Sequence, residues 1–284
     1  MRALGVTRAL VLGGGGVAGI AWELGVLLGL RDAGVDVTDA DRVVGTSAGS
    51  AVAAQVLSGI PLEELFERQL SPALLDSEIR AELDPEQMVR DFGAALAGKQ
   101  PGTEMYRAVG DLALRADTVD EPVRRAVIER RLPEDAWPYR DLWITAIDAS
   151  TGEFRVFTRA DGVDLVDAVA ASCAVPGIWP PVTINGDRYV DGGMRSTTNQ
   201  DLATGCDPVI VIGPSTASML PSPDVVRGEE ELRARASIVT ITADEQSLAA
   251  LGTNPLDPAA ARPAALAGRA QAASHVDEVR AVWG

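Results

Sequence analysis

Histidine, lysine and cysteine are scarce in this sequence of 284 residues. Cys173 and Cys206 are the two cysteines, too few for a disulfide scaffold, so we expect reduced thiols in a cytoplasmic protein. His275 is the single histidine, and no cluster of cysteine and histidine exists for zinc or histidine-ligated iron. We therefore expect no metal and no organic cofactor. Lys99 is the single lysine among 25 basic residues, a bias that indicates no function.

Positive charge is also in deficit, because the formal net charge is −16. Such a charge argues against a nucleic-acid partner and against docking on anionic lipid by simple attraction. It leaves room for a lipid substrate in a pocket and for transient membrane contact. Hydrophobic residues make up 46% of the chain, enough for a large core, and we expect one domain over residues 1–284.

A long hydrophobic run is absent in the sense that a membrane anchor requires. Ala9 to Leu30 is almost uncharged, but it contains four consecutive glycines and Glu23 and lacks a convincing cleavage site. A strand, a glycine-rich turn and a buried helix explain this stretch better. We expect no integral membrane segment and no signal peptide.

Alternating strands and helices open the chain and predict an α/β fold with a mostly parallel central sheet. The opening comprises a strand over 8–12, a loop over 13–16, a helix over 18–33 stopped by Gly34, a strand at 43–44 and a helix over 50–57. Later we expect a hairpin of 142–147 with 154–158, strands at 209–212 and 238–241, and helices over 164–172 and 264–283.

Residues 60–138 have a different texture, with charged and apolar residues interleaved at helical spacing. One helix is expected to begin at Pro85, after Asp84. The stretch fits a helical insertion or lid, and equally an ordinary pair of helices on the flank of the sheet. Its apolar residues could form core or line an acyl channel, and we favour core for Leu62, Leu65, Phe66, Leu74 and Leu75.

The segment Gly45-Thr46-Ser47-Ala48-Gly49 matches the G-x-S-x-G pattern of a nucleophile elbow. A β-branched strand precedes it and a small-residue helix follows it, which is the context that such an elbow requires. Gly45 and Gly49 allow a tight turn and give a substrate access to the Ser47 hydroxyl. Small residues at such a turn can also serve packing alone. Serine is a weak nucleophile by itself, so a base and an oxyanion site are needed.

A glycine loop, Gly14-Gly15-Gly16 with Gly19 beyond it, lies between the first strand and its helix. Its N–H groups suit either a developing oxyanion or a phosphate, since the spacing also satisfies G-x-G-x-x-G. A dinucleotide site would need an acidic residue near the end of the second strand. That strand leads instead into Ser47, so a dinucleotide-binding protein is the weaker alternative.

Asp191 is the candidate base, because Gly192 and Gly193 directly after it leave its carboxylate uncrowded at a strand end. An ordinary turn is the alternative, because Asp-Gly is a common turn pair. A Ser-His-Asp triad could use only His275, whose polar neighbours indicate a solvated side chain. The economical arrangement is a dyad in which Asp191 takes the proton of Ser47 directly.

In this order, the glycine loop, the G-x-S-x-G and the D-G-G resemble the patatin-like phospholipase family. The segments 171–177, 180–182 and 145–157 also resemble the family, and the similarity spans about 8–60 and 140–213. The resemblance implies a three-layer α/β/α fold and hydrolysis of lipid acyl esters, of phospholipase A, lysophospholipase or esterase type. It implies Ser47 as nucleophile, Asp191 as base and the N–H groups of Gly14, Gly15 and Gly16 as oxyanion donors.

Two departures from the family pattern concern residues beside these motifs. Family members usually carry Arg or Lys where this chain has Ala18, and Arg195 is a candidate to replace that charge in part. Asn199 is followed by Gln200 rather than by the family's Asn-x-Pro. The loss at Ala18 leaves a catalytically weakened, lipid-binding relative as the main alternative. The sequence does not determine the lipid, the head group or the oligomeric state.

Overall fold

The computed structural model describes residues 7–81, 84–218, 220 and 222–284. Strands in this part of the chain are β1 Ala9–Leu12, β2 Arg42–Gly45, β3 Asp141–Asp148, β4 Phe154–Phe157, β5 Val182–Ile184, β6 Asp187–Asp191, β7 Val209–Ile212 and β8 Ile238–Ile241. The helices are α1 Gly16–Asp32, α2 Ala48–Val56, α3 Leu62–Leu70, α4 Ala73–Ser77, α5 Pro85–Leu96, α6 Thr103–Arg115, α7 Glu121–Arg131, α8 Leu165–Ser172, α9 Pro223–Arg235, α10 Glu245–Leu251, α11 Ala261–Gln271 and α12 Val276–Trp283.

One mostly parallel sheet organises the molecule, in the order β5-β6-β3-β2-β1-β7-β8, with β4 paired to β3. The strands from β3 through β2, β1 and β7 to β8 pair in parallel. At the other end β3 pairs antiparallel with β4 and β6, and β6 with β5. The central strand β1 is apolar throughout because both of its faces are covered. The predicted parallel sheet is confirmed.

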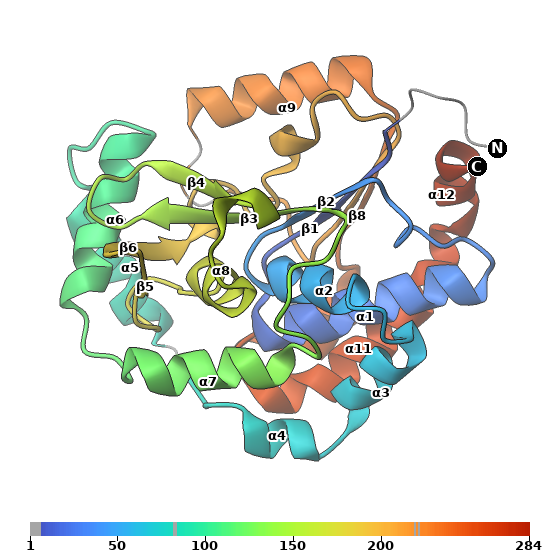
Figure 1. The fold of residues 1–284 in the computed structure, drawn as a ribbon, viewed down its shortest axis with the longest axis horizontal. Coiled ribbons are helices and arrows are strands. Elements are labelled where there is room, and N and C mark those ends of the chain that lie inside the picture. Colours follow the sequence, from blue (N-terminus) through green and yellow to red (C-terminus); the bar gives the residue numbers. More distant parts are fainter. Residues whose placement is uncertain (1–6, 82–83, 219, 221) are drawn as a thin grey trace.

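Helices cover both faces of the sheet, which gives three layers. Side chains alternate along a strand, so Leu10 and Leu12 of β1 lie in the core between the sheet and the helices α1, α2 and α8. Ala9 and Val11 enter a smaller core that includes Leu232 of α9. Figure 1 shows α9 above the strands and the larger group of helices below them. The three-layer α/β/α fold predicted from the sequence is confirmed.

Helix α1 is buried along nearly its whole length, between the sheet and α11. Glycines make this close packing possible: a Cβ on Gly25 would lie 2.2 Å from the carbonyl oxygen of Ala265, and one on Gly29 2.5 Å from that of Arg269. The helix ends at Asp32, and Gly34 takes a φ of 83°, as the predicted stop requires. Despite this burial, no helix among the described residues is both long and apolar enough to span a bilayer.

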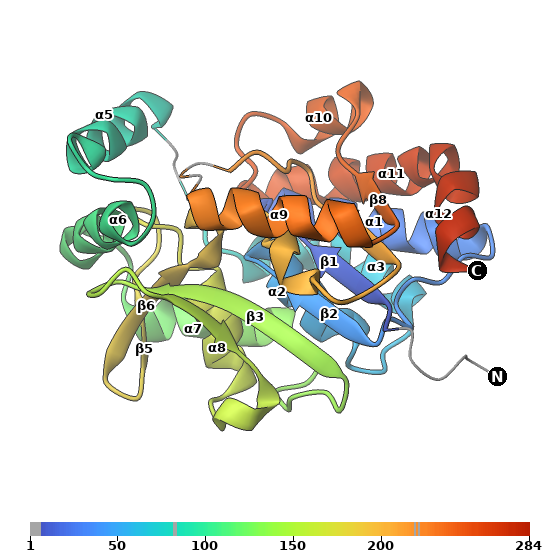
Figure 2. The same ribbon diagram turned by 90° about the horizontal axis from the view of Figure 1, so that it is seen from above.

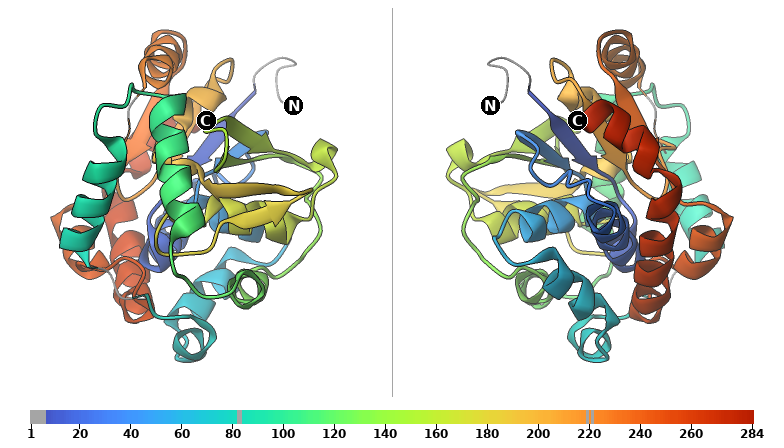
Figure 3. Two further views of the ribbon diagram at one scale, coloured as in Figure 1. Left: turned by 90° about the vertical axis from the view of Figure 1, so that its left-hand side faces the viewer. Right: turned by 90° about the vertical axis from the view of Figure 1, so that its right-hand side faces the viewer.

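Helices α3 to α7 occupy much of residues 60–138, and α3 packs in a different core from α5 and α6. Leu62, Leu65 and Phe66 of α3 are buried in the main core, whereas the side chains of Leu74 and Leu75 lie outside the described residues. Helices α5 and α6 lie side by side at the β4–β6 end (Figures 2 and 3), where they pack with β3 and β6. The Asp84 carboxylate caps α5 by accepting from the Gln87 N–H at 2.9 Å. Whether this stretch acts as a lid stays a prediction.

The last helix is where the sequence prediction is wrong. One helix was expected over 264–283, but a short turn, Ala272–Ser274, separates α11 from α12. The break lets the chain turn so that the Trp283 indole N–H donates to the Asp36 carbonyl at 3.0 Å. Helical periodicity continues across the break, so it could not reveal this tertiary contact. The sequence analysis also omitted α9 and α10.

The packing of α1 on α11 predicts the effect of two alanine substitutions. Gly25→Ala is expected to lower the free energy of unfolding by about 1–3 kcal/mol or more, because its methyl group overlaps the backbone of α11. Gly93→Ala in α5 is the matched control, since a Cβ there meets no atom within 4 Å and alanine favours a helix. Urea denaturation of the two variants measures the difference. Equal stabilities would contradict the close packing.

Candidate active site

Strand register brings Ser47 and Asp191 together although they are distant in sequence. Gly45, the last residue of β2, pairs with Ile144 of β3. Two residues further along β3, Ala146 pairs with Asp191, the last residue of β6. Ser47 follows the end of β2 by two residues, so both side chains lie at the same edge of the sheet. The Ser47 hydroxyl there lies beside the Asp191 carboxylate, close enough to lower the pKa of that group.

The turn after β2 holds Ser47 in a strained backbone conformation, with φ of 53° and ψ of −117°. The flanking glycines permit the turn because a Cβ on Gly49 would lie 2.1 Å from the Leu12 carbonyl oxygen. A Cβ on Gly45 would lie 2.6 Å from the Cα of Ser50. The two glycines therefore let the turn pack directly on β1 and α2.

The C-terminal end of α8 holds the backbone of Ser47 from the other side. The Ser47 N–H donates to the Ser172 hydroxyl at 2.9 Å, and the Cys173 thiol donates to the Ser47 carbonyl at 3.2 Å. Burial raises the pKa of the Cys173 thiol to about 11, so it stays protonated and can donate. Sequence reasoning placed both residues in the segment 171–177 but assigned them no task. Only the tertiary contact reveals it.

Asp191 is a buried carboxylate without a cationic partner among the described residues. It is 2% exposed, and it accepts the Gly193 N–H at 2.7 Å. Burial raises its pKa to about 7, and the neighbouring Ser47 hydroxyl and the Gly193 N–H offset that effect only in part. Gly192 is required at the turn because a Cβ would lie 2.4 Å from the Thr145 hydroxyl oxygen.

The glycine loop lies against Ser47. A Cβ on Gly14 would lie 3.5 Å from the Cβ of Ser47, and one on Gly19 3.5 Å from that of Ala48. The Gly14 N–H already donates to the Thr197 carbonyl at 2.8 Å. Gly15 caps α1 and Gly16 begins it, and their N–H groups have no acceptor among the described residues.

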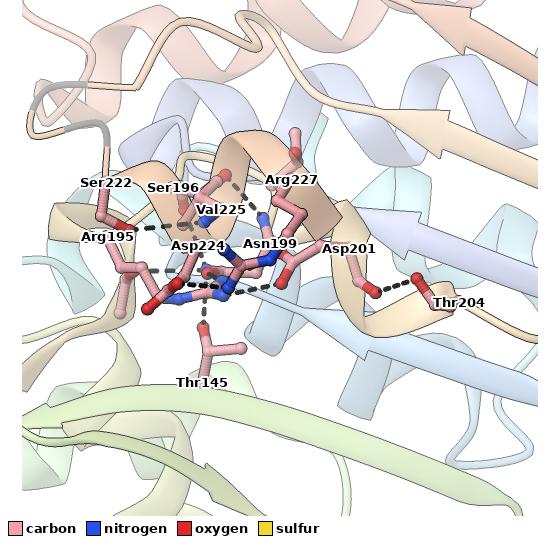
Figure 4. A network of polar contacts seen from close by, with 12 residues as sticks. Thr145, Arg195, Ser196, Asn199, Asp201, Thr204, Ser222, Asp224, Val225 and Arg227 are labelled. Atoms are coloured by element: carbon pink, nitrogen blue, oxygen red, sulfur yellow. Dashed lines mark hydrogen bonds and ion pairs between the residues drawn. The ribbon is translucent and has the colours of Figure 1, made fainter. Parts of the chain in front are cut away.

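Asn199 joins the turn of Ser47 to the turn of Asp191. It is fully buried, and its amide nitrogen donates to the Thr46 hydroxyl at 3.0 Å and to the Gly192 carbonyl at 3.2 Å. The Thr145 hydroxyl donates to that of Thr46 at 3.0 Å. Asn199 thus fixes the spacing of the two turns without the proline that the family pattern places after it. Figure 4 shows Asn199 and Thr145 of this network together with Arg195 and Asp201.

Arg195 is committed to the same network and does not replace the missing charge at Ala18. Its guanidinium donates to both carboxylate oxygens of Asp201, at 2.9 and 2.6 Å, and to the Asn199 side-chain oxygen at 2.7 Å. It also lies over the Phe154 ring, 4.2 Å from the centroid. Ala18 is fully buried in the apolar core, so no charge is present there.

The space in front of Ser47 is small. Ser47 is 8% exposed and borders a cavity of about 10 Å³, room for about one water molecule. Its walls are mostly apolar but include two arginines, the lining residues being Gly16, Val17, Ile20, Ser47, Ala48, Arg124, Arg131, Cys173, Val175, Trp179 and Leu256. A substrate must move part of this wall to reach the hydroxyl.

Neither His275 nor a metal-binding cluster accompanies Ser47 and Asp191 among the described residues. His275 lies between α11 and α12, where its Nδ1 is 3.7 Å from a Glu278 carboxylate oxygen, and no contact with Ser47 or Asp191 is present. Over residues 7–81, 84–218, 220 and 222–284, no group of three Asp, Glu, His or Cys side chains is arranged to hold a metal ion.

Comparisons with known proteins bear on this arrangement of motifs. An omega-hydroxyceramide transacylase of Mus musculus is 29% identical over 182 residues, which is 62% of this chain and 25% of the relative. An uncharacterized protein of Acanthamoeba polyphaga mimivirus is 23% identical over 191 residues, 66% of this chain and 58% of the relative. The chain thus spans between a quarter and about three-fifths of these relatives.

Two solved bacterial structures resemble the chain over nearly its whole length. VipD of Legionella pneumophila is 14% identical with a TM-score of 0.46, covering 97% of this chain and 67% of that one. The type III effector ExoU of Pseudomonas aeruginosa is 17% identical with a TM-score of 0.43, covering 96% and 53%. A family model described as patatin-like phospholipase matches residues 10–204, which include the glycine loop, Ser47 and Asp191. The chain therefore belongs to the patatin-like phospholipase family.

Proposed function

We propose that this protein is a serine acyl hydrolase that cleaves carboxylic esters of lipids, of phospholipase A, lysophospholipase or esterase type. One feature carries the proposal: the Ser47 hydroxyl lies beside the buried Asp191 carboxylate, and burial raises the pKa of that carboxylate to about 7, which suits a general base. The alternative of a weakened lipid-binding relative requires that this pair be inactive.

In the proposed reaction Asp191 removes the proton of Ser47 while the serine oxygen bonds to the acyl carbon. The tetrahedral intermediate collapses, the alcohol leaves with the proton from Asp191, and the acyl group stays on Ser47. Asp191 then takes a proton from a water molecule that attacks the acyl-enzyme. The second tetrahedral intermediate collapses, Asp191 returns that proton to the Ser47 oxygen, and the fatty acid is released. This sequence needs neither a histidine nor a metal.

Backbone N–H groups beside Ser47 are proposed to hold the oxyanion. Gly15 and Gly16 have N–H groups without acceptors among the described residues, at the start of α1 where the helix dipole favours negative charge. Gly14, whose N–H donates to Thr197, holds the loop in place instead. The Ala48 N–H, which follows the nucleophile and begins α2, is a further donor of the kind found in other nucleophile elbows.

Acyl transfer to an alcohol is a second candidate, favoured by the transacylase relative and by the small, mostly apolar cavity. A site that excludes water gives an acceptor alcohol the advantage in the second half of the reaction. The two candidates share the acyl-enzyme at Ser47. Products formed with and without added glycerol distinguish free fatty acid from transferred ester.

Ser47→Ala and Asp191→Asn are each expected to abolish ester hydrolysis and labelling by a fluorophosphonate probe. The first variant lacks the attacking oxygen, and the second lacks the base that activates it. Turnover of a soluble short-chain ester and in-gel fluorescence measure the two losses. Appreciable turnover by folded Ser47→Ala would overturn the proposal, whereas a folded native protein that neither turns over nor labels would favour a lipid-binding relative.

The raised pKa of Asp191 predicts how rate and stability change with pH. The base acts as the carboxylate, so kcat/KM is expected to rise as pH increases and to level off above about 7. The fold favours the protonated form of the Asp191 carboxyl. As pH rises from the ordinary pKa of an aspartate to about 7, this group therefore lowers the free energy of unfolding. Asp191→Asn lacks that contribution, and denaturation of both proteins at several pH values isolates it. A rate independent of pH across this interval would contradict the assignment.

A further inference from the structure

Arg124 is the unusual residue in the wall of the Ser47 cavity. It lies on α7, is 5% exposed and borders the same cavity as Ser47. Its guanidinium stacks on the Trp179 ring, 3.8 Å from the centroid. Stacking satisfies the face of a guanidinium but not its N–H donors, which lie in the plane and point away from the ring.

Those in-plane donors have no acceptor. No hydrogen bond runs from the Arg124 side chain to any described residue, and its terminal nitrogen NH1 is buried without a partner. The nearest carboxylate oxygen, on Glu78, is 4.0 Å away, beyond hydrogen-bond distance. Glu78 instead binds Arg131 through both oxygens at 2.6 Å. Of the two cavity arginines, Arg131 is thus hydrogen-bonded to Glu78, whereas Arg124 forms only a long ion pair of 4.0 Å with the same carboxylate.

A buried cation in this position is unfavourable unless something pairs with it. Burial and the neighbouring Arg131 lower the pKa of Arg124 to about 9, so the group still carries its charge at neutral pH. Glu78, which is already bound by Arg131, pairs with Arg124 only at 4.0 Å, and a buried charge with such incomplete pairing costs stability. Proteins commonly keep a destabilising group of this kind where the group has a function.

We propose that Arg124 binds an anionic group of the substrate, a phosphate or a carboxylate, beside the ester that Ser47 attacks. The inference rests on the proposed function and narrows its substrates to esters with a negative charge close to the acyl group. A guanidinium presents a fork of donors that matches two oxygens of such an anion. The ring of Trp179 fixes the plane of that fork.

The surroundings of Arg124 favour an anion although the chain is acidic overall. A second cavity of about 60 Å³ shares Val17, Ile20 and Arg131 with the first. It is lined in addition by Arg68 and Arg130, and Glu78 is the one acidic residue that borders either cavity within the described part of the chain. Arginines thus outnumber acidic residues around the two cavities, although Arg68 pairs with Glu64 and the protein has a net charge of −16.

The test compares three short esters that stay monomeric: hexanoyl glycerol, hexanoyl glycerol phosphate and hexanoyl glycerate. They share an acyl group and differ in whether the alcohol is neutral, a phosphate or a carboxylate. Arg124→Met keeps an apolar side chain over Trp179, and Arg124→Lys keeps the charge without the fork. Arg227→Met is the control for loss of one positive charge, because Arg227 lies exposed on α9 and pairs with Asp224.

For Arg124→Met we expect the ratio of kcat/KM on an anionic ester to that on the neutral ester to fall about 10- to 100-fold. Arg124→Lys should lose less and Arg227→Met nothing. Loss confined to the phosphate or to the carboxylate ester identifies the anion. A ratio that stays unchanged, or an equal loss on all three esters, would overturn the proposal. Thermal denaturation separates a structural role, since removing a buried charge that has no hydrogen-bond acceptor should not lower Tm.

Binding measurements keep this inference separate from the proposed function. Calorimetric titration of hexanoyl glycerol phosphate and hexanoyl glycerate into Ser47→Ala, and into Ser47→Ala with Arg124→Met, needs no turnover. Weaker binding of either anionic ester by the double variant supports the anion site, even if the native protein hydrolyses none of the three esters. Equal binding of both by the two variants would refute it, even if the native protein is an active hydrolase.

Discussion

The burial of Asp191 beside Ser47 is the constraint on which the rest of the site depends. This carboxylate is 2% exposed and lacks a cationic partner among the described residues, so burial raises its pKa to about 7 while the Ser47 hydroxyl and the Gly193 N–H lower it only in part. Water would stabilise the charged form and lower its basicity. The site must therefore exclude water, and the cavity of about 10 Å³ at Ser47 meets that demand.

Small side chains allow the layers to close tightly enough to exclude water. Gly49 brings the turn of Ser47 onto β1, and Gly192 brings the turn of Asp191 onto β3, each at distances that a methyl group would forbid. Asn199 then ties the two turns with donors to Thr46 and Gly192. The distance between Ser47 and Asp191 is thus set by backbone contact and one buried amide, which are stiffer than a pair of long side chains.

Charge is distributed differently inside the site and over the molecule. The chain as a whole is strongly acidic, yet the cavity in front of Ser47 is bordered by Arg124 and Arg131. Arg195, the basic residue nearest to the D-G-G turn in sequence, has its donors taken by Asp201 and Asn199. Arg124 is far from every motif in the sequence, and its guanidinium N–H groups donate to none of the described residues. Availability of donors, and not sequence proximity, decides which arginine can meet a ligand.

The sequence by itself determined the order of the motifs and much of the sheet. Apolar strands such as β1, the glycine stop after α1 and the hairpin of β3 with β4 are local patterns, and local patterns are visible in a sequence. Ser47, Asp191 and their glycines were chosen for the same reason, since each lies within a few residues of the turn that defines it. Their chemical roles remain a proposal.

Only the tertiary structure decided which donors are occupied. The Gly14 N–H donates to Thr197 and the Ser47 N–H donates to Ser172. The indole N–H of Trp283, brought back by the turn between α11 and α12, donates to Asp36. Each of these depends on a partner far away in the chain, and no periodicity or spacing encodes such a pairing. Arg124 is the same case in reverse: its α7 sequence is an ordinary charged helix, and burial against Trp179 makes it a candidate binding group.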